Sequence, residues 1–211
     1  MKHIRLTFIF LCCLPLFFIS CSSDEEITKK GASQELITKA KDFLTGEIVL
    51  NTHATMSGVS KTLLKTGCPT KFRFEWKETD KETFTVALLN FTVGKMGMII
   101  NFKCNVKIMP LNTWEKDEYP GPGWIKFYGE DGSTWGEDEN GTPSNAKGSN
   151  VKGYYNTDTH QINFIVDYNM MNVRSECFLQ TINKSRISNY KQELAQFEKD
   201  LEEYKKQNGL S

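Results

Sequence analysis

The chain has 211 residues, of which 39% are hydrophobic, and it carries 26 basic and 26 acidic side chains. This length is sufficient for one domain with a proper hydrophobic core. A formal net charge of zero lacks the concentrated positive charge of a protein that binds nucleic acid, so we expect no nucleic-acid partner.

The N-terminal segment has the order of a secretory signal peptide. Lys2 and Arg5 precede an apolar run over residues 6–19, which is too short to span a bilayer comfortably. The small residue Ser20 and then Cys21 follow this run. We therefore predict a signal peptide over residues 1–20, and no later apolar run is long enough to cross a membrane.

The end of this segment, Phe18-Ile19-Ser20-Cys21, resembles the lipobox of bacterial lipoproteins. The resemblance implies that the signal is cut before Cys21, that Cys21 is the lipidation site, and that this lipid anchor is the protein's contact with the membrane. Several acyl chains on one cysteine anchor a protein stably. The alternative is an ordinary cleaved signal peptide that leaves Cys21 free.

Residues 21–32 are predicted to form an acidic tether. The stretch Ser22-Ser23-Asp24-Glu25-Glu26 resembles the acidic surface-export signal of lipoproteins in the Bacteroidetes. That resemblance implies an outer membrane lipoprotein at the cell surface. The alternative is a solvated tether without an export role.

Three cysteines remain in the domain after the tether, namely Cys68, Cys104 and Cys177. An odd number allows at most one internal disulfide and leaves a thiol over. The two histidines of this part, His53 and His160, are far apart in the sequence, and no Cys-x-x-Cys motif occurs. We therefore expect no metal site and no cofactor.

A short amphipathic helix is predicted over residues 33–44, followed by a change to strand periodicity. Ser33 can cap the helix, and its apolar residues fall on one stripe. From residue 47 to about residue 183 the apolar residues alternate, most clearly over Met98–Ile108. Eight strands are predicted near residues 47–57, 70–78, 82–93, 98–108, 123–129, 150–156, 161–168 and 172–181.

The short turns between most of these strands favour antiparallel neighbours. In the strand over 82–93 the apolar phase flips after Leu88, which predicts a β-bulge there or a stretch buried on both faces. The segment 89–104 also matches the segment 162–177 without gaps, including Cys104 and Cys177. This similarity indicates either an internal duplication or two independent hairpins with the same burial pattern, and it places both cysteines on the buried side.

Two segments between the strands are predicted to be irregular, namely 110–122 and 129–150. The second is rich in Gly, Asp, Glu, Asn and Ser, and we expect a long exposed loop. Its acidic clusters, Glu130-Asp131-Gly132 and Glu137-Asp138-Glu139-Asn140-Gly141, contain only a fragment of a calcium-binding loop pattern, so a solvated loop is the expectation.

The C-terminal segment 186–211 is predicted to be an amphipathic helix over about 186–207. Its apolar residues recur at alternating spacings of three and four: Ile187, Tyr190, Leu194, Phe197, Leu201 and Tyr204. This heptad pattern fits a helix packed along the wall of the domain, or a two-chain coiled coil that would make a homodimer.

The layout over residues 33–205 resembles the lipocalin-like (calycin) domains of Bacteroidetes lipoproteins, several families of which have no assigned function. It combines an exported tether, a helix ending in Phe43-Leu44-Thr45-Gly46-Glu47, a strand meander and a C-terminal helix. The resemblance implies an all-β fold over residues 33–185, an eight-stranded antiparallel meander barrel with an interior that can hold one small ligand. A β-sandwich is the alternative fold.

In such a barrel the inward aromatic residues would form a ligand pocket for a small, mostly apolar molecule. The candidates are Phe72, Phe74, Trp76, Phe102, Phe164, Tyr168 and, depending on the register, Trp124 or Ile125. A filled core is the alternative.

Catalysis is not expected, because no Gly-x-Ser-x-Gly, His-Glu-x-x-His or glycine-rich phosphate motif occurs. We therefore predict a membrane-anchored binding protein rather than an enzyme. The alternative is a protein-interaction or assembly module of the cell envelope that uses the C-terminal helix.

Overall fold

The computed structural model describes residues 32–93, 97–138 and 140–210. The predicted signal peptide, Cys21 and nearly all of the predicted tether lie outside the described residues. The elements are α1 (Gln34–Phe43), β1 (Gly46–Met56), β2 (Val59–Ser60), β3 (Cys68–Trp76), β4 (Thr83–Phe91), β5 (Met98–Met109), α2 (Thr113–Glu118), β6 (Trp124–Asp138), β7 (Pro143–Asn156), β8 (Gln161–Asp167), β9 (Val173–Thr181) and α3 (Arg186–Gln207). No helix of the described part is long and apolar enough to cross a membrane.

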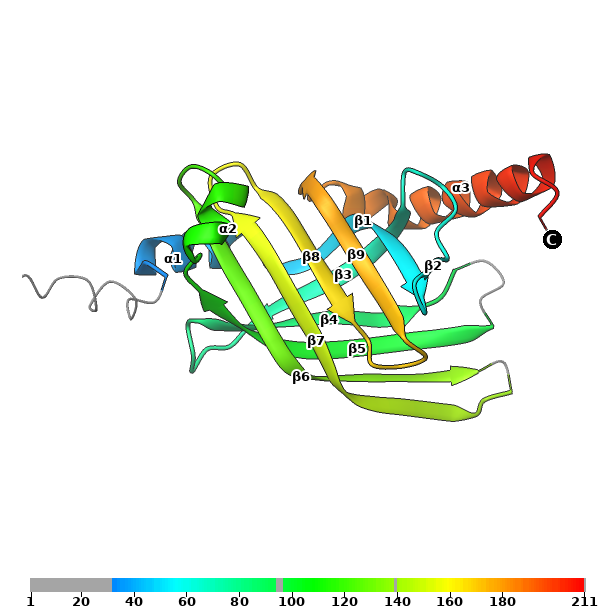
Figure 1. The fold of residues 1–211 in the computed structure, drawn as a ribbon, viewed down its shortest axis with the longest axis horizontal. Helices are drawn as coiled ribbons and strands as arrows, with labels where there is room; N and C mark the ends of the chain where they lie inside the picture. The colour runs from blue at the N-terminus through cyan, green and yellow to red at the C-terminus, as the bar shows by residue number, and fades with distance from the viewer. Residues whose placement is uncertain (1–31, 94–96, 139, 211) are drawn as a thin grey trace, which may run out of the picture. The chain divides into compact units, whose positions relative to one another are not determined.

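Eight of the strands form a closed antiparallel barrel (Figure 1). From β3 to β9 each strand pairs with the next one in the sequence, and β1 joins the two edges by pairing with both β3 and β9. The predicted meander barrel is therefore confirmed, and the β-sandwich alternative is wrong. The two-residue strand β2 is an addition that pairs with the last two residues of β1.

The closure depends on a change of partner in the middle of β1. Residues Gly46 to Thr52 pair with β3, whereas Thr52 to Met56 pair with β9. Before Thr52, β9 no longer reaches β1 by strand pairing, and the side chain of Gln180 fills the gap. Its amide accepts from the Asn51 backbone N–H and donates to the Asn51 carbonyl, both at 2.9 Å. Side-chain hydrogen bonds thus complete the seam where the two strands diverge.

The start of α3 fixes the same seam from outside. The Arg186 guanidinium donates to the Asn51 side-chain oxygen at 2.7 Å and forms an ion pair with Glu193 at 2.6 Å. Along the helix, the heptad stripe faces the barrel, with Phe197 buried and Leu194 and Leu201 half-buried. The helix lies against β1 and β3, as the wall-packing prediction requires.

The two ends of the barrel differ in what covers them. At the capped end, where β1 begins at Gly46 and β3 ends at Trp76, helix α1 covers the barrel. Its residues Ile37 and Ala40, together with Leu44 after it, belong to the core. The open end is the opposite one, where β1 ends at Met56 and β4 ends at Phe91.

The predicted long loop over 129–150 is wrong, because most of it belongs to strands β6 and β7. Figure 1 shows this hairpin continuing beyond β8, which pairs with β7 only from Asn150 onward. Glycines permit close packing here: a Cβ at Gly129 would collide with the Asn105 carbonyl, and one at Gly132 would lie 2.7 Å from the Ser149 carbonyl. The polar composition therefore reflects close strand packing and bulges.

The irregular segment 110–122 contains the short helix α2, which is held by a buried carboxylate. Glu115 accepts hydrogen bonds from the Asn112 backbone N–H and the Tyr154 hydroxyl, and it pairs with Lys126 at 2.7 Å. Burial opposes the ionisation of Glu115, but these partners outweigh it and lower its pKa below the ordinary value. The helix is thereby attached to the outside of β6 and β7.

The predicted bulge after Leu88 is confirmed, since the pairing of β4 with β5 shifts register between Leu88 and Phe91. The two similar hairpins do not share a pairing register. Cys104 lies opposite Val86, whereas Cys177 lies opposite Phe164, the counterpart of Phe91. The two hairpins are therefore alike in burial but not in register, and both cysteines are buried as predicted.

The seam predicts a specific loss of stability. Replacing Gln180 by Ala removes both bonds to the Asn51 backbone and leaves a part-buried N–H and carbonyl unpaired, so we expect the free energy of unfolding to fall by about 1–3 kcal/mol. Urea denaturation measures the change. The matched control is Gln192→Ala on the exposed side of α3, for which we expect a change within about 0.5 kcal/mol. Equal stabilities for the two variants would contradict this account of the seam.

Candidate functional site

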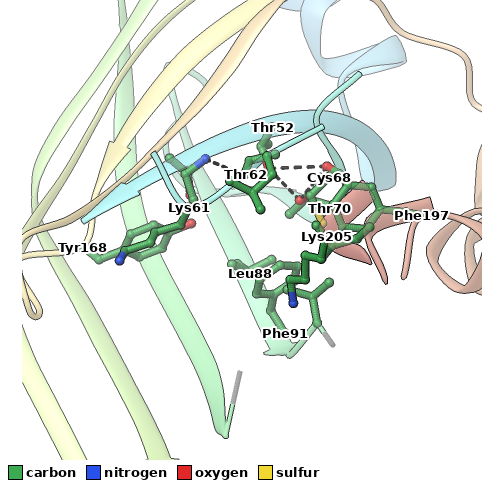
Figure 2. Close-up of a pocket in the computed structure, with 15 residues that line it drawn as sticks. Thr52, Lys61, Thr62, Cys68, Thr70, Leu88, Phe91, Tyr168, Phe197 and Lys205 are labelled. Atoms are coloured by element: carbon green, nitrogen blue, oxygen red, sulfur yellow. Dashed lines mark hydrogen bonds between the residues drawn. The ribbon is translucent and has the colours of Figure 1, made fainter. Parts of the chain in front are cut away.

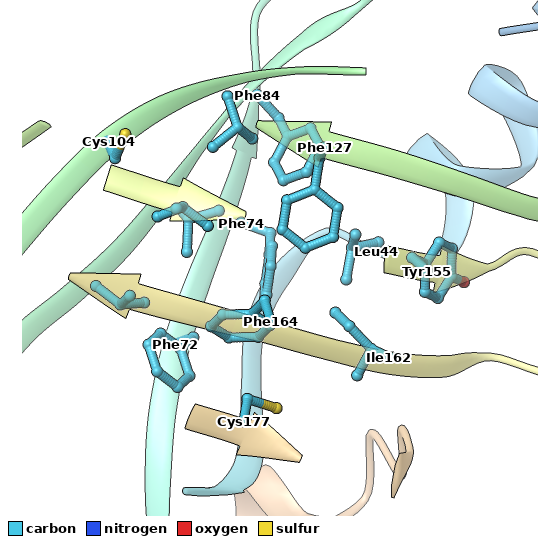
Figure 3. Packing of buried hydrophobic residues seen from close by; sticks show 14 of the residues in the cluster. Leu44, Phe72, Phe74, Phe84, Cys104, Phe127, Tyr155, Ile162, Phe164 and Cys177 are labelled. Carbon is cyan, nitrogen blue, oxygen red and sulfur yellow. The ribbon is translucent and has the colours of Figure 1, made fainter. Parts of the chain in front are cut away.

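Most of the predicted pocket aromatics fill the barrel instead of lining a space (Figure 3). Phe72, Phe74, Phe102 and Phe164 are each at most 2% exposed. The ring of Phe164 makes edge contacts with Phe72 at 4.9 Å and with Phe74 at 6.3 Å between centroids. Rings at such distances and angles are packed against one another. These four residues therefore form a core, which was the alternative to a pocket.

The three remaining candidates lie in three different places. Trp76 is at the capped end, where its indole N–H donates to the Leu44 carbonyl at 2.6 Å. Trp124 packs outside the barrel against Tyr119, and its neighbour Ile125 takes the inward position. Of the two alternatives that the sequence left open, the inward residue is therefore Ile125 and not Trp124, because neighbouring residues of a strand point to opposite faces. Tyr168 is the only one of the seven that borders a cavity of the open end.

The capped end is sealed by ring packing as well as by α1. Phe43 stacks on His160 with ring centroids 3.5 Å apart and planes nearly parallel. The Nδ1 atom of His160 lies 3.0 Å from the Tyr155 hydroxyl, within hydrogen-bonding distance. His160 thus has a structural role between the helix and the barrel.

Two adjoining cavities occupy the open end. Their volumes are about 280 Å³ and 450 Å³. They share six lining residues, which come from β1, the segment after β2, β4, the β8–β9 turn and β9: Ala54, Lys61, Leu88, Phe91, Tyr168 and Ser175. Figure 2 shows side chains around the smaller cavity. The barrel is therefore packed at one end and hollow at the other.

The hollow follows from small side chains at inward positions. Ala54 and Ser175 lie directly opposite each other on β1 and β9. At the corresponding inward positions, the packed half of the barrel carries rings and large aliphatic side chains instead. The bulge in β4 turns both Leu88 and Phe91 toward the cavities, so that the wall remains apolar. Small residues on one side and a bulged apolar strand on the other together leave space.

Helix α3 forms one wall of the smaller cavity. Beyond Thr52, β1 has left β3, and this side is covered by residues after β2 and by α3. Phe197, Leu201 and Lys205 of the helix line the cavity there. The C-terminal helix therefore completes the site, which its heptad pattern alone did not indicate.

The polar groups in the wall are largely satisfied by one another. The hydroxyls of Thr52 and Thr70 lie 2.8 Å apart, and Thr70 donates to the Cys68 carbonyl at 3.1 Å. Burial raises the pKa of Tyr168 to about 12, so its hydroxyl is neutral at physiological pH. The cavity thus offers mainly apolar surface, with few uncommitted polar atoms.

Five of the six residues shared by the cavities were missed as lining residues, namely Ala54, Lys61, Leu88, Phe91 and Ser175. An aromatic residue at an inward position is conspicuous in a sequence, but it fills space. A small residue at an inward position leaves space. Ala54 of β1 and Ser175 of β9 are such residues, and the alternation of these strands could have identified them as cavity-lining. Lys61 carries no such signal, because it lies in the segment between β2 and β3.

Within the residues that the structure describes, no group of three His, Cys, Asp or Glu side chains is arranged to hold a metal ion. Asp138, one of the acidic residues considered for calcium, caps the β6–β7 turn by accepting from the N–H groups of Asn140 and Thr142. Glu139 lies outside the described residues. The three cysteines are free and buried, so no disulfide joins them.

The fold defines a closed, mostly β barrel protein with an accessible hollow at one end. In comparison with protein families, residues 21–209 match the family described as a domain of unknown function, DUF4903. The chain belongs to this family. Neither the curated proteins nor the solved structures gave a match.

The free thiols predict slow chemical modification of the folded protein. Burial raises the pKa of Cys68 to about 12 and that of Cys104 to about 11, and it raises the pKa of Cys177 as well. The thiolate is the reactive form, so we expect little reaction with a thiol reagent at pH 8 and reaction of all three thiols after denaturation. A count of fewer than three under denaturing, non-reducing conditions would indicate a disulfide and contradict the structure. The measurement uses a chain that begins at Ser22, without Cys21.

Proposed function

We propose that the open end of the barrel binds a small, mostly apolar molecule. The observation that carries this proposal is the pair of adjoining cavities, bordered by Leu88, Phe91 and Tyr168 and closed on one side by α3. Sites for small molecules are typically concave, mostly apolar and about 300–1,000 Å³ in volume. The larger cavity, of about 450 Å³, falls within this range, and the smaller one, of about 280 Å³, adjoins it.

Binding, rather than catalysis, is the function we propose for this site. The lining contains the Cys68 thiol and the Tyr168 hydroxyl, besides the side chains of threonines, a serine and two lysines. Burial raises the pKa of Cys68 and that of Tyr168 to about 12, so neither of these two groups is ionised at neutral pH. An activated nucleophile requires a lowered pKa or an adjacent base. The raised pKa values therefore favour a binding protein.

We further propose that the barrel is held at the outer membrane, at the cell surface, by acyl chains on Cys21. The lipobox-like segment supports this, and so does the family match, which begins at residue 21. The described chain starts at Ala32, which packs against the core and precedes α1. Residue 32 thus lies at the capped end of the barrel, and the cavities open at the other end.

The apolar stripe of α3 is assigned to the barrel in this proposal, because Phe197 and Leu201 line the smaller cavity. A homodimer through the same stripe would require the helix to leave the barrel wall. We therefore place ligand binding ahead of assembly as the function of the domain.

A probe of cavity binding tests the main proposal. The uncharged fluorophore N-phenyl-1-naphthylamine should bind the chain from Ser22 onward with a saturable rise in fluorescence. Replacing Ala54 by Phe puts a ring into the space shared by both cavities, so we expect the dissociation constant to rise about tenfold or more. A fluorescence titration measures it.

The matched control is Ala195→Phe, which adds the same ring on the exposed side of α3. It should bind the fluorophore like the unmodified protein. Unchanged saturable binding by the Ala54→Phe variant, or no binding by the unmodified protein, would contradict the proposal.

The anchor has its own test. In the full-length protein, produced in a bacterium that processes lipoproteins, Cys21→Ser should abolish incorporation of labelled palmitate and release the protein from the membrane fraction. The control Cys13→Ser removes a thiol from the predicted signal peptide and should leave labelling intact. Persistent labelling of the Cys21→Ser protein would refute Cys21 as the lipid site.

A further inference from the structure

Among the residues that the structure describes, the charged ones that line the two open-end cavities are all basic. Lys61 borders both cavities, Lys205 borders the smaller one, and neither lining contains a described aspartate or glutamate. The whole chain has equal numbers of acidic and basic residues, so this one-sided selection is a property of the site and not of the composition. A site lined by one sign of charge favours ligands of the other sign.

Lys61 is held at the mouth by its backbone. Its N–H donates to the Ala54 carbonyl at 2.8 Å, which fixes this residue beside the strand that forms the shared wall. Its side chain is exposed, and among the described residues it makes no ion pair. A solvated ammonium at the edge of an apolar space can meet a charged group without the cost of burying it alone.

Lys205 approaches from α3. Figure 2 shows its side chain reaching toward Leu88 and Phe91 of β4, the two apolar residues of the opposite wall. The ammonium lies 3.2 Å from a carboxylate oxygen of Glu202, which is outside the cavity lining and largely exposed. An ammonium has three donors, so the pair with Glu202 leaves Lys205 able to donate to a second anion.

We propose that the ligand is an anionic amphiphile, with a single apolar chain in the cavities and a carboxylate or phosphate head group at Lys61 and Lys205. This inference rests on the proposed function and adds the chemical class of the ligand. The chain would lie among Leu88, Phe91 and Tyr168, where the polar wall atoms are already paired. The head group would remain at the rim, beside the lysines that line the cavities.

The test compares ligands that share a chain and differ in the head group. The chain from Ser22 onward is suitable, because the closed barrel, its core, α1 and α3 all lie within residues 32–210. Calorimetric titration below the micelle concentration uses decanoate, decyl phosphate, decanol and decyltrimethylammonium. We expect either anion to bind about 5–10-fold more tightly than decanol, and the cation to bind most weakly. The tighter of the two anions identifies the preferred head group.

Matched variants locate the effect. Lys61→Met and Lys205→Met should each weaken anion binding about 3–10-fold and leave decanol binding unchanged. The controls are Lys65→Met and Lys206→Met, exposed lysines close in sequence that line neither cavity, and they should have no effect. Thermal melting confirms that each variant is folded.

Three results would overturn the inference, and they separate it from the proposed function. Equal binding of decanoate and decanol, unaffected by either cavity lysine, would refute the anionic head group and leave the apolar site intact. Losses of the same size in the control variants would show a general effect of surface charge. Absence of binding by all four probes would refute the proposed function, and the inference would fall with it.

Discussion

The fold depends on the change of partner at Thr52 of β1. One strand has to join β3 to β9, and it does so by pairing with β3 in its first half and with β9 in its second half. A sheet with unpaired edges exposes rows of backbone donors and acceptors, and closure removes them. Because strand pairing with β9 stops at Thr52, the Gln180 amide and the Arg186 guanidinium complete the seam by bonding to Asn51.

The same change of partner creates the space that we interpret as the binding site. Beyond Thr52, β1 leaves β3, and α3 covers this side of the barrel with Phe197 and Leu201. The seam, the cavity and the position of the helix are thus consequences of one geometric requirement. At the capped end β1 remains with β3, α1 covers the opening, and aromatic side chains fill the interior.

Much of the fold was predictable because its signals are local. Alternation with period two gave the eight barrel strands, the phase flip after Leu88 gave the bulge, and the heptad stripe gave α3. The extension of β6 and β7 was missed because its glycines and polar residues resemble those of a loop. Gly129 and Gly132 are required instead where neighbouring backbones approach too closely for a Cβ. That requirement depends on pairing between distant segments, which composition does not reveal.

The site was less predictable than the fold, since the hollow depends on which inward residues leave space. The aromatic residues singled out in the sequence, such as Phe72 and Phe164, pack together, whereas the cavities are bordered by Ala54 and Ser175. The sequence also left open whether Trp124 or Ile125 points inward, and in the structure it is Ile125. Inward position can be inferred from alternation, but the fit between opposite walls requires three-dimensional coordinates.

The central claim is that the barrel is solid at the capped end and hollow at the open end. Xenon binds in empty apolar cavities of proteins, so a crystal of this protein under xenon pressure tests the claim directly. The account predicts xenon beside Leu88 and Phe91, and none among the rings of Phe74, Phe84 and Phe127. Xenon among those three rings, or its absence beside Leu88 and Phe91, would contradict it.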